Sequence, residues 1–234
     1  MVSQGTGWKD AAGARDAPPV SRLGGRPPVD RRDTFFAHGR VRWLRRCLDS
    51  LGERPSHMMA LGWDPGATSS ELFEQLRIHS LVTVDVERHF ADSGALRSAD
   101  GKATYVHVTD YRATEAADLA FTNGVFERLS VLERAAAAML VFRSLQPGGL
   151  FAVWQNNPWA LKTIFDVWSP TLRDEPPGLT PPAARRLLRG VGFDIVHTTS
   201  TFHFPRALTW CHPVEPLLGS IPLGAQYMIL ARKP

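Results

Sequence analysis

Apolar residues recur along the chain in two alternating patterns, one typical of helices and one typical of short buried strands. The first helical pattern begins at Thr34 and is closed by Gly52, with arginines mostly on the faces that the apolar residues leave free. Its apolar positions are Val41, Leu44, Cys47, Leu48 and Leu51. We therefore predict an amphipathic helix from Thr34 to the residue before Gly52.

Short apolar runs follow, separated by turns or by further helical patterns. These runs are 57–61, 81–86, 105–108, 119–122 and 149–154. After the first run, Thr68-Ser69-Ser70-Glu71 has the spacing of a capping box, which predicts a helix that begins just after Gly66. Another helical pattern fills the interval before the fifth run, and Gln146-Pro147-Gly148-Gly149 is expected to end it.

The last part of the chain predicts one more helix and the closing strands. Thr180 is expected to cap a helix that has Pro181 at its first position. Segments 193–196, 201–204 and 226–231 have the pattern of closing strands. Because short apolar strands alternate with helices, the sequence predicts a doubly wound α/β fold whose parallel sheet is covered on both faces.

Composition divides the chain of 234 residues into a tail and one domain. Residues 1–33 are rich in Gly, Pro, Arg and Asp, so burial of apolar groups cannot offset the entropy of ordering them. The chain as a whole is 44% hydrophobic and 21% charged, which is enough for one sizeable core. We expect a flexible tail over 1–33 and a single domain over 34–234.

Charge and cysteine content narrow the classes of function. A net charge of +4 permits acidic ligands or nucleic acid but requires neither. Cys47 and Cys211 have no partners at metal-ligand spacing, and no histidine pair has zinc spacing, so we expect neither a disulfide framework nor a metal site. No signal-peptide core and no run of about 20 apolar residues occurs. These features predict a cytoplasmic protein without a membrane span.

Polar and glycine residues stand where the predicted strands end, which is where open α/β sheets bind their ligands. Gly62 and Gly66 would let the backbone approach a ligand, and the helix that follows would present its N-terminus to an anion. Asp85 lies 19 residues after Gly66, a position from which an acid can accept hydrogen bonds from ribose hydroxyls. Asp110 could accept from an exocyclic amine. Taken singly, an aspartate that ends a strand is more often a helix cap or turn former than a ligand.

The ordered set of segments resembles the class I S-adenosylmethionine-dependent methyltransferases of the small-molecule kind, from Thr34 to Pro234. MMALGWDPG stands where that family has its glycine-rich loop, VTVDV supplies the acid for the ribose, and VTDY would flank the adenine. ADLAFTNGVFERL is similar to the fourth-strand motif that borders the methionine portion, and LQPGGLFAV and QYMILARK complete the pattern.

This resemblance implies a Rossmann-like, seven-stranded, mostly parallel sheet with helices on both faces, and S-adenosylmethionine as the cofactor. It assigns no catalytic residue. The residues that it places around the cofactor are Gly62, Trp63, Asp64, Gly66, Asp85, Val86, Asp110, Tyr111, Asn123 and Gly124.

The glycine-rich loop departs from the family pattern at two positions. Ala60 stands where the family usually has an acid, and Asp64 stands where it usually has a glycine. Asp64 would bring bulk and negative charge near an anionic carboxylate, at a cost of about 1 to 3 kcal/mol. Three interpretations follow: weakened cofactor binding, a silent scaffold or partner-binding protein, or use of the bound sulfonium for other chemistry.

The acceptor side is predicted from residues after the fifth strand and near the C-terminus. Asn156, Asn157 and Trp159 could bind an acceptor through amides and an aromatic wall, or could form a turn with Trp159 packed over the core. His203, between Phe202 and Phe204 on a predicted strand, could be a general base or a surface histidine.

These patterns favour a methyltransferase that acts on a small-molecule, biosynthetic acceptor. The alternatives are the silent binding protein and an RNA methyltransferase that uses the arginines of the tail and first helix, which would bind RNA with a steep salt dependence. The acceptor and the oligomeric state are left open by the sequence.

Overall fold

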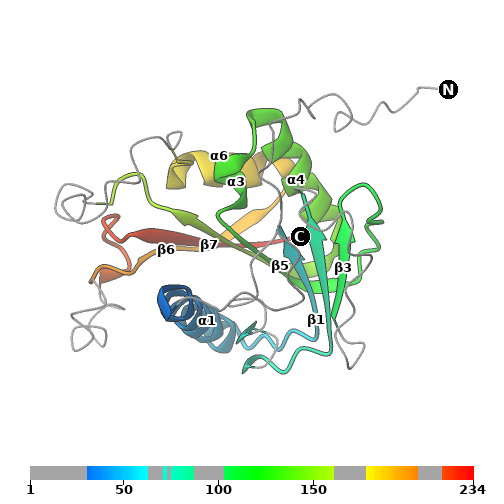
Figure 1. Cartoon of the computed structure of the whole chain (residues 1–234), viewed down its shortest axis with the longest axis horizontal. Coiled ribbons are helices and arrows are strands. Elements are labelled where there is room, and N and C mark those ends of the chain that lie inside the picture. Colours follow the sequence, from blue (N-terminus) through cyan, green and yellow to red (C-terminus); the bar gives the residue numbers. More distant parts are fainter. Residues whose placement is uncertain (1–30, 63–70, 73–74, 87–102, 161–177, 205–217) are drawn as a thin grey trace, which may run out of the picture.

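The computed structural model describes residues 31–62, 71–72, 75–86, 103–160, 178–204 and 218–234 (Figure 1). The helices are α1 (Arg31–Leu51), α3 (Val125–Arg128), α4 (Val131–Ser144) and α6 (Pro181–Val191). The strands are β1 (His57–Leu61), β2 (Ser80–Asp85), β3 (Ala103–His107), β4 (Ala117–Asn123), β5 (Leu145–Asn156), β6 (Asp194–Thr201) and β7 (Gln226–Arg232).

The strands form one seven-stranded sheet in the order β3-β2-β1-β4-β5-β7-β6. Strands β1 to β5 pair in parallel, and β7 is antiparallel to both of its neighbours, β5 and β6. The chain proceeds outward from β1 to β3 and then crosses to β4 on the other side of β1, so the strand order reverses between β1 and β4. The predicted doubly wound, mostly parallel sheet is confirmed, and its switch point lies between these two strands.

Helices cover both faces of the sheet, as Figure 1 shows: α1 lies on one face, and α3, α4 and α6 lie on the other. On the first face, Val41, Leu44 and Leu48 of α1 pack against a cluster that includes Phe121 and Trp154. Each side chain of this size contributes about 1.5 to 3 kcal/mol when it is fully buried. The apolar stripe that the sequence predicts for the first helix therefore packs against the sheet.

The opposite face is packed mainly by small and branched residues of the helices. Ala137 and Val141 of α4 and Leu188 of α6 share a buried cluster with Phe151 and Val153 of β5. This cluster holds α4 and α6 side by side on this face, with α4 over β1 and β5 and α6 over β6 and β7.

The helix boundaries agree with the sequence in part. Helix α1 begins at Arg31, three residues before the predicted start, and ends before Gly52, whose φ is +73°. Helix α4 begins with a capping box that we did not predict: Ser130 Oγ accepts from Glu133 N at 3.4 Å, and Glu133 Oε2 accepts from Ser130 N at 2.8 Å. Thr180 stands at the N-cap of α6 and Pro181 at its first position, as predicted, although the Thr180 side chain makes no capping hydrogen bond.

Two of the predicted closing strands are also corrected. A single strand, β6, covers Asp194–Thr201, and residues 202–204 lie outside any strand. The reason is the left-handed backbone of Phe202, whose φ of +60° takes the chain out of the extended ladder. His203 is therefore not on a strand. In the fifth predicted run, β5 starts earlier than expected, so the Gln146 to Gly149 turn lies within its bounds.

None of the described helices is long and apolar enough to span a membrane. Of the helix predicted after Gly66, the described residues Glu71 and Leu72 are helical, and its capping-box residues 68–70 lie outside the described residues.

Candidate cofactor and acceptor site

The residues predicted to surround the cofactor lie at or just beyond the carboxyl ends of β1, β2, β3 and β4, except that Trp63, Asp64 and Gly66 lie outside the described residues. Because these strands are parallel, their ends form one edge of the sheet on either side of the switch point. The fold therefore brings together the segments that the sequence placed around one ligand.

Gly62 ends β1 in a conformation that only glycine accommodates there. Its φ is +87°, and its N–H donates to the carbonyl of Val84 at 2.7 Å. A Cβ at this position would lie 2.2 Å from Cγ2 of Val125, at the start of α3. Gly62 is thus held tightly against β2 and α3.

Asp85 is the last residue of β2 and is buried, with 6% of its surface exposed. Its carbonyl accepts from Val108 N at 2.8 Å, which fixes the start of the turn after β3. Val86 packs against the core on the α4 face. Within that turn, the N–H groups of Asp110 and Tyr111 both donate to the carbonyl of His107, at 2.9 and 3.1 Å. The Asp110 side chain is exposed, and Tyr111 is partly buried.

Asn123 and Gly124 end β4 across the switch point from Gly62. Gly124 has a φ of +68° and donates from its N–H to the carbonyl of Trp154 at 2.9 Å. A Cβ built on Gly124 would meet no atom within 4 Å, so the space beside this turn is open. The Thr122 hydroxyl donates to the carbonyl of Leu61 at 3.0 Å and joins the ends of β4 and β1.

Ala60, where the family pattern has an acid, is 1% exposed in the apolar cluster beneath α1. A carboxylate placed there would have to be desolvated among apolar side chains. The packing around β1 therefore suits alanine.

A chain of hydrogen bonds crosses the sheet where β5 ends and β7 begins. Glu127 accepts from Asn156 N at 2.5 Å and from Asn156 Nδ2 at 3.0 Å. Gln226 Nε2 donates to Asn156 Oδ1 at 3.2 Å, and Arg40 Nε donates to Gln226 Oε1 at 3.1 Å. This network joins α3 on one face to α1 on the other. Sequence reasoning missed Arg40 and Gln226, because the two residues stand 186 positions apart.

The other two predicted acceptor residues after β5 are Asn157, whose side chain is buried and hydrogen-bonded, and Trp159, whose ring is exposed. Asn157 is 1% exposed, and its Nδ2 donates to the carbonyls of Pro222 and Gly224 at 2.9 and 2.8 Å. Its Oδ1 accepts from the N–H of Trp159 at 3.1 Å. The side chain of Trp159 is 45% exposed, so its ring is available to a ligand. Asn157 thus holds the loop that presents Trp159, and a substrate contact by Asn157 stays a prediction.

His203 follows Phe202, whose ring belongs to an aromatic cluster at the N-terminal half of α1. His203 Nε2 lies 3.0 Å from the carbonyl of Ile221. The ring of Phe202 contacts those of Phe35 and Phe36, with centroids 6.0 and 4.9 Å apart. Trp43 lines a separate cavity farther along α1.

Tyr227 is buried beside the network at the start of β7. Its hydroxyl donates to the carbonyl of Leu179 at 2.6 Å. Burial raises the pKa of Tyr227 far above its ordinary value, with the negative charge of Glu127 adding to the shift and Arg134 opposing it. The phenol is therefore neutral at physiological pH and serves as a fixed hydrogen-bonding group.

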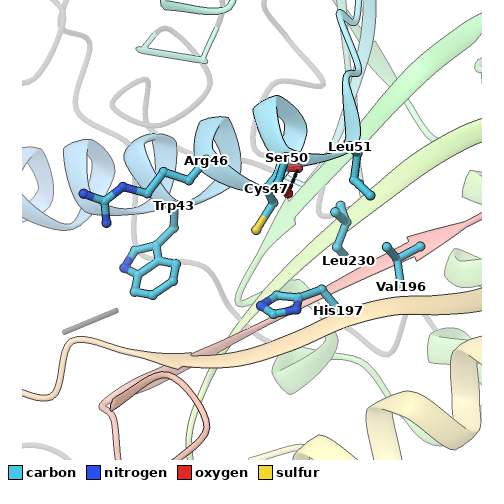
Figure 2. Close-up of a pocket in the computed structure, with 8 residues that line it drawn as sticks. All are labelled: Trp43, Arg46, Cys47, Ser50, Leu51, Val196, His197 and Leu230. Atoms are coloured by element: carbon cyan, nitrogen blue, oxygen red, sulfur yellow. Dashed lines mark hydrogen bonds between the residues drawn. The ribbon is translucent and has the colours of Figure 1, made fainter. Parts of the chain in front are cut away.

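Two cavities lie beside β6, one on each face of the sheet. One, of about 250 Å³, lies between α1 and the first half of β6, where Trp43, Cys47 and His197 point into the same space (Figure 2). Burial raises the pKa of the Cys47 thiol. The other, of about 170 Å³, lies between α6 and the last residues of β6. The second cavity is at the carboxyl end of the sheet, on the same edge as the strand-end residues.

Comparison with known proteins finds similarity at the level of three-dimensional structure. No protein-family profile and no curated sequence matches the chain. A S-adenosylmethionine-dependent methyltransferase from Mesorhizobium loti superposes with a TM-score of 0.57 at 14% identity, covering 84% of this chain and 100% of that one.

Two further solved structures carry S-adenosylhomocysteine. The N-methyltransferase NodS from Bradyrhizobium japonicum has a TM-score of 0.56 at 15% identity and covers 86% of this chain and 88% of its own. The 1,6-didemethyltoxoflavin-N1-methyltransferase of Burkholderia thailandensis has a TM-score of 0.55 at 19% identity and covers 86% and 81%. The chain therefore has the fold of the S-adenosylmethionine-dependent methyltransferases.

Proposed function

We propose that the protein is a S-adenosylmethionine-dependent methyltransferase that acts on a small-molecule, biosynthetic acceptor. The observation that carries this proposal is the set of strand ends around the switch point. Gly62 is held in a left-handed turn, Asp85 is a buried acid at the end of the neighbouring strand, and Gly124 borders open space across from both. Small-molecule methyltransferases with bound S-adenosylhomocysteine share the fold.

The described residues fit the cofactor in shape and in hydrogen-bonding capacity. Asp85 would accept hydrogen bonds from the ribose hydroxyls, and the turn of Asp110 and Tyr111 would flank the adenine. The backbone at Gly62 and Gly124 would border the methionine portion, and the left-handed turns leave no side chain between the backbone and that ligand. The bound group would supply an electrophilic methyl on sulfur.

The task of the protein in such a transfer is mainly positional. Methyl transfer to an activated acceptor requires the acceptor atom and the sulfonium to be close and in line, and holding two reactants in that geometry can supply most of the rate enhancement. Glu127 and Asn156, locked together at 2.5 and 3.0 Å, form a rigid wall between the end of β4 and the end of β5. We assign them the role of shaping the acceptor side of the site.

Calorimetric titration of the full chain with S-adenosylmethionine and with S-adenosylhomocysteine tests the proposal. Asp85→Ala should weaken both affinities at least tenfold, about 1.4 kcal/mol, without changing the thermal midpoint by more than a degree or two. Asp194→Ala is the matched control, because Asp194 is an exposed aspartate at the opposite end of the sheet. An unchanged affinity in Asp85→Ala would contradict the assignment.

The same titration separates the enzyme from the silent binding protein. If the unmodified chain binds neither compound at millimolar concentration, the strand-end set is not a cofactor site, and the proposed function is wrong. Micromolar binding would show that the loop accommodates Asp64, and methyl transfer from labelled S-adenosylmethionine to candidate acceptors would then be measured.

A further inference from the structure

The cavity between α6 and β6 lies on a row of polar side chains that leads away from the candidate cofactor site. In the sheet register, Gln155 of β5 pairs with Tyr227 of β7, which pairs with Ser200 of β6. Directly paired residues share a face of a sheet, and Tyr227 belongs to the cluster beneath α4 and α6. Tyr227 and Ser200 line the cavity, so this row joins it to the end of β5.

Two polar groups of the cavity have hydrogen-bonding capacity that the protein does not use. Arg185 of α6 and Thr198 of β6 both line it, and both Arg185 Nε and Thr198 Oγ1 are buried atoms without a hydrogen-bond partner. No ion pair joins Arg185 to a carboxylate in the described part of the chain. Leaving a buried donor unpaired costs about 1 to 3 kcal/mol, and more for a charged group.

The inner end of the row shows the same feature. Gln155 is fully buried, and neither its Oε1 nor its Nε2 has a partner. Three unpaired polar side chains on one face, at the ends of β5 and β6 and on the helix above them, point to a ligand that supplies the missing partners.

The geometry points to the cavity as the site for the carboxylate of a methyl acceptor, bound by the Arg185 guanidinium and the Thr198 hydroxyl; this inference rests on the proposed function. A planar guanidinium matches a carboxylate in charge and geometry. The exposed ring of Trp159 lines the same cavity and offers a wall for a flat, apolar part of the acceptor.

The sheet also sets the direction of such an acceptor. Strand β7, which carries Tyr227, is separated from β4 only by β5, so the two strands lie about 10 Å apart at the usual strand spacing. A carboxylate held between α6 and β6 would leave the rest of the acceptor on the cavity side of Tyr227, at the edge of the sheet that also carries Gly124. The substrate class is thus a small aromatic or apolar acid whose reacting atom lies at the end opposite to the carboxylate.

Benzoate and its neutral analogue benzamide are matched probes of this site. Each probe would be titrated into the full chain, which carries nitrogen-15-labelled arginine and is saturated with S-adenosylhomocysteine. The titration follows the NMR resonance of the Arg185 Nε–Hε group, which is assigned by its loss in Arg185→Lys. Benzoate should shift this resonance saturably, and benzamide should bind at least tenfold more weakly. In ligand-observed titrations, Arg185→Gln should weaken benzoate binding at least tenfold and Thr198→Val should weaken it by a smaller factor. Arg186→Gln, an exposed arginine on the same helix, should change nothing.

Each other outcome overturns the inference. If the Arg185 resonance shows no saturable shift up to about 10 mM benzoate, which is ten times a millimolar Kd, the cavity does not bind carboxylates. Equal binding of benzamide, or unchanged benzoate affinity in Arg185→Gln, would show that the guanidinium is not the recognition group. Inorganic phosphate that binds Arg185 as tightly as benzoate would show an anion site without an acceptor wall. Calorimetry with S-adenosylhomocysteine on the same variants keeps the two proposals separate, because its affinity should not depend on Arg185.

Discussion

Replacing Gln155 by methionine should stabilise the protein. The Gln155 side chain is 0% exposed, and both of its amide atoms lack a hydrogen-bond partner. Removing a buried amide that has no partner recovers a desolvation cost of about 1 to 3 kcal/mol. Methionine is unbranched and close to glutamine in volume, so it should fill the same space without strain. We expect the free energy of unfolding of the ligand-free protein to rise by this amount.

Urea denaturation followed by circular dichroism measures this change, with an unchanged slope against urea showing that both proteins unfold in the same way. In a chain of this size each kcal/mol corresponds to about 2 to 4 °C in the thermal midpoint. The same variant should keep its affinity for S-adenosylhomocysteine. It should change the affinity for benzoate only modestly, because Gln155 does not line the cavity in which benzoate is expected to bind.

Asn157 supplies the control for this experiment, since it is a buried amide two residues away with its hydrogen bonds made. Asn157→Leu would leave the carbonyls of Pro222 and Gly224 and the N–H of Trp159 without their partner. We expect it to destabilise the fold by at least about 2 kcal/mol. If Gln155→Met were as unstable as Asn157→Leu, or no more stable than the unmodified chain, the argument from unpaired atoms would be refuted for both Gln155 and the cavity beside it.

Three further predictions concern other parts of the chain. Gly62→Ala should destabilise the fold by about 1 to 3 kcal/mol, because φ at this position is +87° and the new Cβ would contact Val125. Adding Val125→Ala should relieve the contact but not the backbone strain, and a double-mutant cycle measured by urea denaturation would separate the two effects. Hydrogen bonds from Ser130 hold the pKa of Glu133 below its ordinary 4.5. The stability that the Glu133 carboxylate contributes, about 0.5 kcal/mol, is therefore present above that pH and is lost as pH falls through the lowered pKa. Glu133→Gln should remove this pH dependence when the free energy of unfolding is measured against pH in acid. Burial raises the pKa of Cys47, so iodoacetamide should alkylate it more slowly at pH 8 in the folded protein than in urea, by mass spectrometry of its peptide.

The architecture of the sheet could be predicted because the signals for it are local. Each buried strand is a short apolar run, and the predicted run 57–61 coincides with β1. The amphipathic stripe of α1 is likewise a local periodicity. Where a local pattern is ambiguous, prediction failed: the alternation at Phe202 and Phe204 is typical of a strand, but the left-handed φ of Phe202 ends β6 one residue earlier.

The candidate site could be predicted only in outline, because its polar contacts join residues that are far apart in the chain. The strand-end residues Asp85 and Gly124 follow from the positions of the strands. In contrast, the hydrogen bond from Arg40 to Gln226 depends on α1 and β7 meeting at one edge of the sheet, and no local pattern marks it. The cavity of Arg185 and Thr198 has the same origin, because a helix and the following strand pack together there.

The distribution of paired and unpaired polar groups separates the two halves of the proposed site. At the end of β5, Glu127 and Asn156 satisfy each other, so this wall is rigid before any ligand arrives. Two strands beyond β5, Thr198 of β6 leaves a buried hydroxyl unpaired in a cavity, and Arg185 of α6 leaves its buried Nε unpaired there, which costs stability in the free protein. A bound ligand that pairs these groups would remove this cost. An acceptor site requires both features: fixed groups that orient the reacting end, and unpaired groups whose hydrogen bonds are completed only by the substrate.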